Sequence, residues 1–225
     1  MFTHFEIGRV AGIPIYLDMM FVLVLLVLTY PYFTGGTTQA VSAGFIIVVG
    51  LLLSILLHEL GHAFAGRLFR ARVAHIELTG LGGLAHFERS LPRSVFARST
   101  IYLAGPAVNL GLWYALGALA VQSYRVGAPL LAEPLGILAG WNFVLLVFNL
   151  LPAYPLDGGH TLDALLGRLL GPVWSVRIVA GLGLLCAAGI AALALQSVAI
   201  FMFLVAVFLA MWNWQKLQSV GGWQR

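Results

Sequence analysis

Two histidines four positions apart enclose a glutamate in one long apolar segment, which runs from Ala40 to Phe64. The residues are His58, Glu59 and His62, in the pattern H-E-x-x-H. On a helix, positions i and i+4 share one face, so the two imidazoles can hold one Zn²⁺ ion. Glu59 lies on the neighbouring face, where it can act as a general base toward a water activated by the metal. A charged side chain in such a segment is costly, which favours a functional reason for it.

A catalytic zinc site commonly has three protein ligands and one open position, so this pair needs a third ligand. Asp157 is the best candidate, because it lies in a run from Pro152 to Gly159 whose prolines and glycines cannot continue a regular helix. Non-helical backbone at membrane depth is tolerated where it lines a cavity or is buried in protein. His160 is the alternative third ligand. The alternative to a metal site is a packing glutamate with hydrogen-bonded histidine neighbours.

The composition indicates a helical membrane protein. The chain has 225 residues, of which 61% are apolar and only 9% charged, whereas a soluble domain is about 25% charged. Its long uncharged runs exceed the roughly 20 residues that one membrane span needs. The net charge is +4, but the basic residues lie between the apolar runs, which argues against a nucleic-acid surface. The single cysteine, Cys186, can form no disulfide within the chain.

We predict an all-α polytopic membrane protein with about six transmembrane helices, in one domain over residues 1–225. The spans fall at about residues 17–33, 39–67, 99–124, 134–151, 173–195 and 197–215. All 12 basic residues except Arg125 then lie on one side of the membrane, together with both termini. By the positive-inside rule this side is the cytoplasm, so we expect a multi-pass protein of the cytoplasmic membrane. The segments that carry His62 and Asp157 approach the same side, which supports a composite site.

Residues 73–88 have a different pattern, with two short alternating runs around a glycine-rich turn, Gly80 to Gly83. This pattern predicts a small β-hairpin at the membrane surface between the second and third spans. Its edge can pair with an extended peptide, and we assign Gly82 and Gly83 to substrate binding on that basis. A plain glycine-rich loop is the alternative. Residues 1–16 suggest a strand-like or interfacial lead-in, and a disordered tail is the alternative.

Taken together, the motifs resemble those of the site-2 proteases, a family of intramembrane zinc metalloproteases. The resemblance rests on the H-E-x-x-H pattern and on the run from Asn149 to Gly159, with support from the stretches Gly105 to Asn109 and Gly80 to Gly83. We interpret the Gly105-Pro106 pair, with Asn109 close behind, as a place of close helix packing rather than of direct catalysis.

The resemblance implies that His58, His62 and Asp157 bind one Zn²⁺ per chain and that Glu59 is the general base. It also implies that Asn149 holds the substrate backbone or the developing oxyanion. The layout is similar to the compact six-span branch of the family, and we expect neither a CBS nor a PDZ domain. The implied activity is that of a zinc-dependent endopeptidase, which cleaves transmembrane segments of membrane-anchored proteins near the cytoplasmic side.

The expected partners are a membrane-embedded protein substrate, the lipid bilayer and either a regulatory membrane protein or a second copy of the chain; no nucleic acid is expected. A membrane transporter or metal carrier that uses the same His and Asp side chains is the main alternative. Against it, the polar residues gather at one end of the spans, with no polar path toward the far side. A catalytically silent binding module is a third hypothesis, against which the complete set of catalytic residue types argues.

Overall fold

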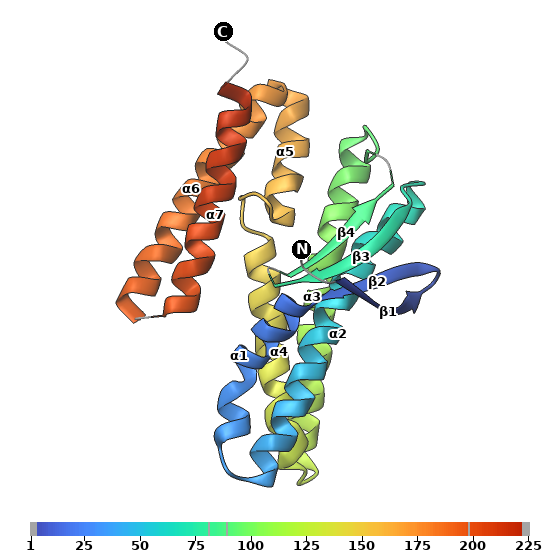
Figure 1. Ribbon diagram of the computed structural model, residues 1–225. Helices are drawn as coiled ribbons and strands as arrows, with labels where there is room; N and C mark the ends of the chain where they lie inside the picture. Colours follow the sequence, from blue (N-terminus) through green and yellow to red (C-terminus); the bar gives the residue numbers. More distant parts are fainter. Residues whose placement is uncertain (1–3, 81, 89, 198, 222–225) are drawn as a thin grey trace. The chain divides into compact units, whose positions relative to one another are not determined.

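The computed structural model describes residues 4–80, 82–88, 90–197 and 199–221. In chain order its elements are β1 (His4–Val10), β2 (Ile13–Asp18), α1 (Met19–Thr34), α2 (Thr38–Leu68), β3 (Val73–Thr79), β4 (Gly82–Phe87), α3 (Val95–Arg125), α4 (Pro129–Asn149), α5 (Asp157–Leu170), α6 (Pro172–Ser197) and α7 (Ile200–Gly221) (Figure 1). They form two compact units: unit 1 comprises Met1–Leu91 and Ala104–Leu146, and unit 2 comprises Pro92–Leu103 and Val147–Arg225. That residues 1–225 act as one domain stays a prediction.

The predicted fold class, a polytopic helical membrane protein with a small strand element, is confirmed. Five helices, α2, α3, α4, α6 and α7, are long and apolar enough to cross a membrane. The first predicted span corresponds to α1, which has 16 residues and is shorter than the roughly 20 that a perpendicular crossing needs. The predicted break near residues 196–197 matches the boundary between α6 and α7.

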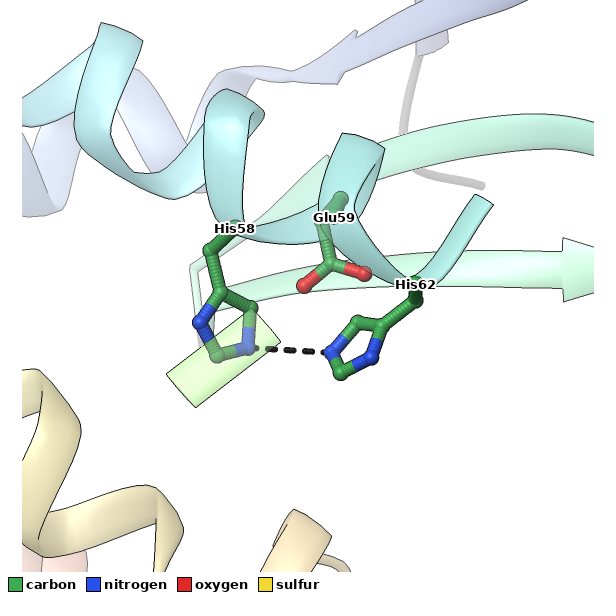
Figure 2. Close-up of side chains that lie close together, drawn as sticks. All are labelled: His58, Glu59 and His62. Atoms are coloured by element: carbon green, nitrogen blue, oxygen red, sulfur yellow. Dashed lines mark hydrogen bonds between the residues drawn. The ribbon is translucent and has the colours of Figure 1, made fainter. Parts of the chain in front are cut away.

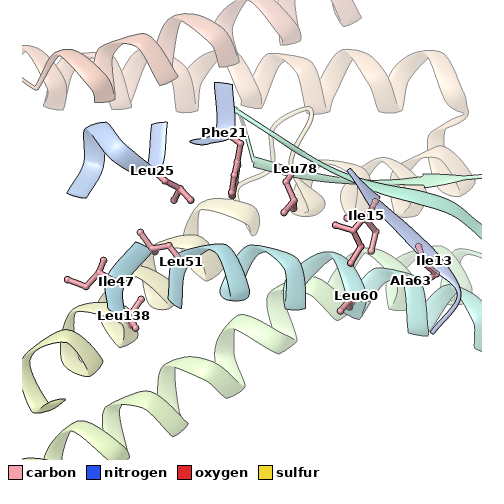
Figure 3. Close-up of a cluster of buried hydrophobic side chains, with 11 residues drawn as sticks. Ile13, Ile15, Phe21, Leu25, Ile47, Leu51, Leu60, Ala63, Leu78 and Leu138 are labelled. Atoms are coloured by element: carbon pink, nitrogen blue, oxygen red, sulfur yellow. The ribbon is translucent and has the colours of Figure 1, made fainter. Parts of the chain in front are cut away.

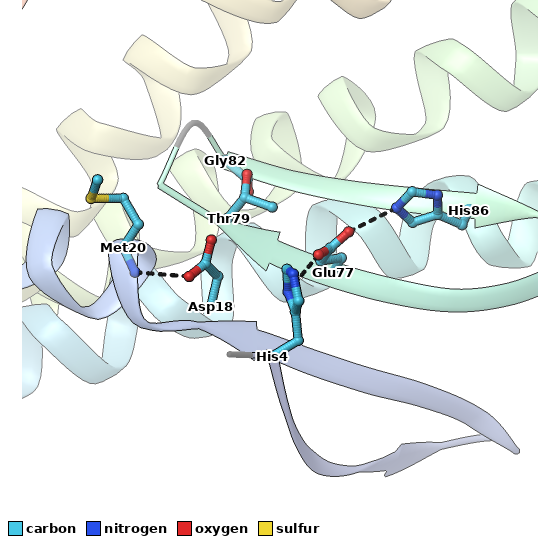
Figure 4. Close-up of polar contacts among 7 residues, drawn as sticks. All are labelled: His4, Asp18, Met20, Glu77, Thr79, Gly82 and His86. Carbon is cyan, nitrogen blue, oxygen red and sulfur yellow. Dashed lines mark hydrogen bonds and ion pairs between the residues drawn. The ribbon is translucent and has the colours of Figure 1, made fainter. Parts of the chain in front are cut away.

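The strand element is larger than the hairpin predicted from residues 73–88. That hairpin exists as β3 and β4, but it belongs to a four-stranded sheet of order β1-β2-β3-β4. The lead-in at the N-terminus forms the antiparallel pair β1 and β2, and β2 runs parallel to β3. At the end of β2, the Asp18 carboxylate accepts a hydrogen bond from the backbone N–H of Met20 and so caps α1 (Figure 4).

The inner face of this sheet packs on α2 through the main hydrophobic cluster of unit 1. Figure 3 shows Ile13 and Ile15 of β2 and Leu78 of β3 on one side, with Leu60 and Ala63 of α2 on the other. All five side chains are at most 5% exposed. Leu60 lies inside the H-E-x-x-H pattern and Ala63 directly follows it, so their burial against the sheet constrains the direction in which the histidines point.

In unit 2, the predicted helix break is present but shorter than expected. Helix α4 ends at Asn149, a loop covers residues 150–156, and the chain is helical again from Asp157, the first residue of α5. The sequence interpretation extended the non-helical run to Gly159 and assigned no helix after it. A carboxylate in the first turn of a helix is favoured by the free N–H groups there, which offsets the poor helix propensity of Gly158 and Gly159.

Candidate metal centre

Helix α2 brings the three residues of the H-E-x-x-H pattern together in the core of unit 1. His58, Glu59 and His62 are only 6%, 5% and 7% exposed. The Nε2 atoms of the two histidines lie 3.1 Å apart, and Figure 2 shows the rings turned toward one another with the Glu59 carboxylate beside them. Two nitrogen ligands of one tetrahedral zinc ion, each about 2.0–2.1 Å from it, lie roughly 3.3 Å apart. The pair is therefore close to the geometry that a shared metal ion requires.

A chain of hydrogen bonds behind His58 fixes the orientation of its ring. Nδ1 of His58 lies 2.5 Å from Oδ1 of Asn109 on α3, and Nδ2 of Asn109 donates to Oδ1 of Asn142 on α4 over 2.9 Å. Asn142 in turn donates to the Ser54 hydroxyl, 2.9 Å away. Since Nδ2 of Asn109 is the donor to Asn142, the atom that faces His58 is its oxygen, which accepts the proton of Nδ1. Nε2 of His58 then carries a lone pair, which is the form that binds a metal.

The sequence interpretation missed this role of Asn109 and Asn142. It treated Asn109 as part of a packing motif and assigned no role to Asn142. Both side chains are fully buried in helices that are otherwise apolar. A buried amide must satisfy its hydrogen bonds inside the protein, so a lone asparagine in an uncharged span was the available signal.

Gly105 of α3 leaves room for an ion between the two histidines. A Cβ atom at this position would lie 2.4 Å from Nε2 of His62 and 2.6 Å from Nε2 of His58. That place is close to where a zinc ion bound to both nitrogens would stand. The approach of the two helices is close elsewhere too, because a Cβ at Gly61 of α2 would lie 2.8 Å from the Ala104 carbonyl oxygen. The residues present therefore fit a metal ion, and Gly105 belongs to the metal centre rather than to helix packing alone.

The two glycines predicted to bind substrate have different positions. A Cβ at Gly83 would lie 2.4 Å from Cγ of Glu59 and 2.6 Å from its Oε1, so β4 passes directly against the carboxylate. Gly82 begins β4 with a φ of +124°, which an L-residue rarely adopts, and a Cβ there would have no atom within 4 Å. Strand β4 thus brings its backbone to the glutamate.

Asn149 and Asp157, the other predicted site residues, belong to unit 2, and their roles stay predictions. Two glycines after Asp157 allow the preceding loop to fold over the start of α5: a Cβ at Gly158 would lie 2.3 Å from the Leu150 oxygen, and one at Gly159 would lie 2.4 Å from the Ala153 oxygen. The first turn of α5, which carries Asp157, is therefore held against the loop backbone.

A third asparagine fixes that loop and was also missed in the sequence. The side chain of Asn213 on α7 accepts a hydrogen bond from the Tyr154 N–H, at 3.0 Å, and donates one to the Tyr154 carbonyl, at 2.7 Å. Gly183 of α6 permits this, because a Cβ there would overlap the Asn213 amide. His160, the alternative ligand, stacks on Tyr102 with 4.8 Å between ring centroids and meets the Tyr154 ring edge-on at 5.4 Å.

The sequence profile of peptidase family M50 matches residues 46–129 and 124–188, which include both the H-E-x-x-H pattern and Asp157. The chain belongs to this family. The resemblance to site-2 proteases is thereby confirmed.

Two known proteins are similar to this chain over about half of its length or more. It is 32% identical to the zinc metalloprotease MJ0392 of Methanocaldococcus jannaschii over 205 residues, which are 89% of this chain and 56% of that protein. It is 32% identical to the stage IV sporulation protein FB of Bacillus subtilis over 120 residues, 53% of this chain and 40% of that protein. The chain thus spans about half the length of these relatives.

The fold of this M50 chain is similar to that of a solved structure, the site-2 protease from Methanocaldococcus jannaschii. The TM-score is 0.68 at 28% sequence identity, and the alignment covers 96% of this chain and 95% of that one. Family membership together with the five apolar helices makes the protein a multi-pass membrane protein.

Proposed function

We propose that this protein is a zinc-dependent intramembrane endopeptidase, which cleaves transmembrane segments of membrane-anchored proteins. The observation that carries the proposal is the pair of Nε2 atoms 3.1 Å apart on His58 and His62, with Glu59 beside them, in a buried part of an apolar helix. The names of two relatives, a zinc metalloprotease and a site-2 protease, support both the zinc ion and the peptidase reaction.

The metal would be held by His58 and His62, with Asp157 as the third ligand. The ring of His58 is already fixed by Asn109, so little motion is needed to bind the ion. Asp157 is proposed because it is the first residue of α5 and directly follows a loop that is held in place by Asn213. The side chain of Asn213 is hydrogen-bonded to both the N–H and the carbonyl group of Tyr154 in that loop. A bound zinc ion supplies Lewis acidity, which activates water and polarises a carbonyl group.

Glu59 is the proposed general base, which accepts a proton from the attacking water at a carboxylate oxygen and passes it to the leaving amine. Burial at 5% exposure keeps bulk water away from that carboxylate. Asn149 is proposed to donate a hydrogen bond from its amide to the oxyanion, a type of contact that contributes about 3–4 kcal/mol in other hydrolases.

Strand β4 is proposed to present the substrate to Glu59. A helical peptide bond is shielded by its own hydrogen bonds, so the substrate must be extended where it is cut. Within the part of the chain that the structure describes, β4 pairs with β3 on one side and with no strand on the other. An extended segment added to this free edge would run past Gly83, whose backbone lies against Glu59.

The basic residues support an orientation with both termini in the cytoplasm and cleavage near the cytoplasmic side. The proposed partners are therefore membrane-anchored proteins whose cleavage releases a cytoplasmic fragment.

The test compares wild type with Glu59→Gln, purified in detergent. The substrates are single-span membrane proteins with a fluorescent tag at each end and with Gly or Pro residues that weaken the span. We expect the variant to keep one zinc ion in the α2 site and to lose roughly 10²–10⁴-fold in cleavage rate, the usual contribution of a general base. A variant that keeps both its zinc and its full rate would refute the mechanism. Zinc transport into vesicles without cleavage would favour the transporter hypothesis instead.

A further inference from the structure

The outer face of the sheet, turned away from α2, carries three histidines around one glutamate. Ile76 and Leu78 of β3 are fully buried on the inner face. Because side chains alternate along a strand, His75 and Glu77 lie on the outer face. The register places His75 directly opposite His86 of β4, so these two imidazoles share that face.

The side chains of this cluster are in contact with one another. Glu77 bridges two histidines: its Oε1 lies 2.6 Å from Nδ1 of His4, and its Oε2 lies 3.0 Å from Nε2 of His86 (Figure 4). The rings of His75 and His86 stack with 4.3 Å between centroids. The donor atoms of His75, Glu77 and His86 all lie within 4.8 Å of one another.

Ion pairing alone explains only part of this arrangement. Glu77 carries one negative charge and can neutralise one imidazolium, yet three imidazoles surround it. Burial and the neighbouring His86 lower the pKa of His75, so the neutral ring is favoured. Neutral imidazole is the form that binds a metal, and three imidazoles with a carboxylate are a donor set that suits zinc. A shift of about 1.5 Å would bring donors now up to 4.8 Å apart to the roughly 3.3 Å spacing of a tetrahedral site.

We propose that these four side chains form a second metal site, which binds a divalent transition-metal ion such as Zn²⁺ on the outer face of the sheet. This site is separate from the α2 histidines and does not depend on the proposed peptidase function. Its side chains remain accessible, since His4, Glu77 and His86 are 42%, 19% and 37% exposed.

The ion would join strands that are not neighbours in the sheet. His4 belongs to β1, which pairs with β2, and β2 pairs with β3 at three positions. The other donors belong to β3 and β4. An ion shared by all of them ties the N-terminal hairpin to the hairpin that carries Gly83, and so stiffens the strand that lies against Glu59.

The test counts zinc ions per chain, on full-length protein in detergent that is purified with a tag free of histidine. We expect two equivalents in wild type and one in His58→Ala/His62→Ala. In that background, Co²⁺ gives a visible absorption spectrum that reports the sheet site alone. Glu77→Gln and His86→Asn should each lower the affinity for the remaining zinc ion roughly 100-fold, because the loss of a direct ligand should cost at least as much as the loss of an outer-shell partner.

Glu6→Gln is the matched control, because Glu6 also lies on β1 and forms an ion pair with the exposed Arg9, 2.8 Å away. This variant should keep both equivalents of zinc.

Zinc should also raise the melting temperature of the His58→Ala/His62→Ala protein. This rise should disappear when His4→Ala is added to that protein, and the exposed position of His4 leaves the fold intact. The proposal is overturned if wild type binds one zinc that is lost entirely with the α2 histidines, or if Glu77→Gln leaves the second equivalent unchanged. Either result leaves the α2 zinc and its function untouched.

Discussion

The substitution Gly105→Ala tests the metal centre with a single methyl group. The added carbon would stand 2.4 Å from Nε2 of His62 and 2.6 Å from Nε2 of His58. A zinc ion bound to both nitrogens would be about 2.0–2.1 Å from each. The methyl group and the ion would therefore compete for nearly the same place.

The neighbouring helix cannot easily move away to relieve this overlap. An ordinary contact needs at least 3.4 Å, so α3 would have to retreat by about 1 Å. The retreat would stretch the hydrogen bond between Asn109 and His58 and open the tight contact at Gly61. Overpacking of this kind costs about 1–3 kcal/mol, and an ion in place would add to it. We expect zinc affinity to fall by roughly 100-fold or more, which corresponds to about 2.7 kcal/mol.

The assay is competition for zinc between the purified protein and a chromogenic chelator, with metal content measured by mass spectrometry. Gly111→Ala is the matched control, because Gly111 lies on the same helix and a Cβ there has no atom within 4 Å. It should bind zinc as wild type does. Wild-type zinc affinity in Gly105→Ala, with the protein folded, would refute the placement of the ion between the two Nε2 atoms.

Three further predictions concern the surroundings of the metal and the loop. Asn109→Leu should lower zinc affinity about 10–100-fold in the chelator assay, because it removes the hydrogen bond that orients His58, whereas Asn109→Asp keeps the acceptor and should lose less. Gly83→Ala should reduce cleavage about 100-fold with zinc retained, because its Cβ displaces Glu59 by about 1 Å; an unchanged rate would contradict the proposed base. Asn213→Leu leaves two buried backbone groups unpaired, at about 1–3 kcal/mol each, and should lower the melting temperature; an unshifted transition would count against the clamp.

The sequence by itself determined the class of the protein and the local part of the metal centre. Uncharged runs longer than a membrane span identify helices without any tertiary information, because the bilayer sets their length. The spacing of His58 and His62 places both on one helix face for the same local reason. Alternation in residues 73–88 was sufficient to predict β3 and β4.

Only the tertiary structure decided what surrounds those residues. Gly105 resembled a packing glycine in the sequence, and its contact with the two imidazoles depends on how α3 lies against α2. The partnership of Asn109 with His58 joins residues 51 positions apart, which no local period encodes. In the same way, β2 pairs with β3 in the sheet although α1 and α2 lie between these strands in the sequence. Periodicity in the sequence shows which face of an element is apolar, whereas packing between elements decides what that face contacts. For this reason the H-E-x-x-H pattern could be recognised in the sequence, and the contacts that Gly105 and Asn109 make with its histidines could not.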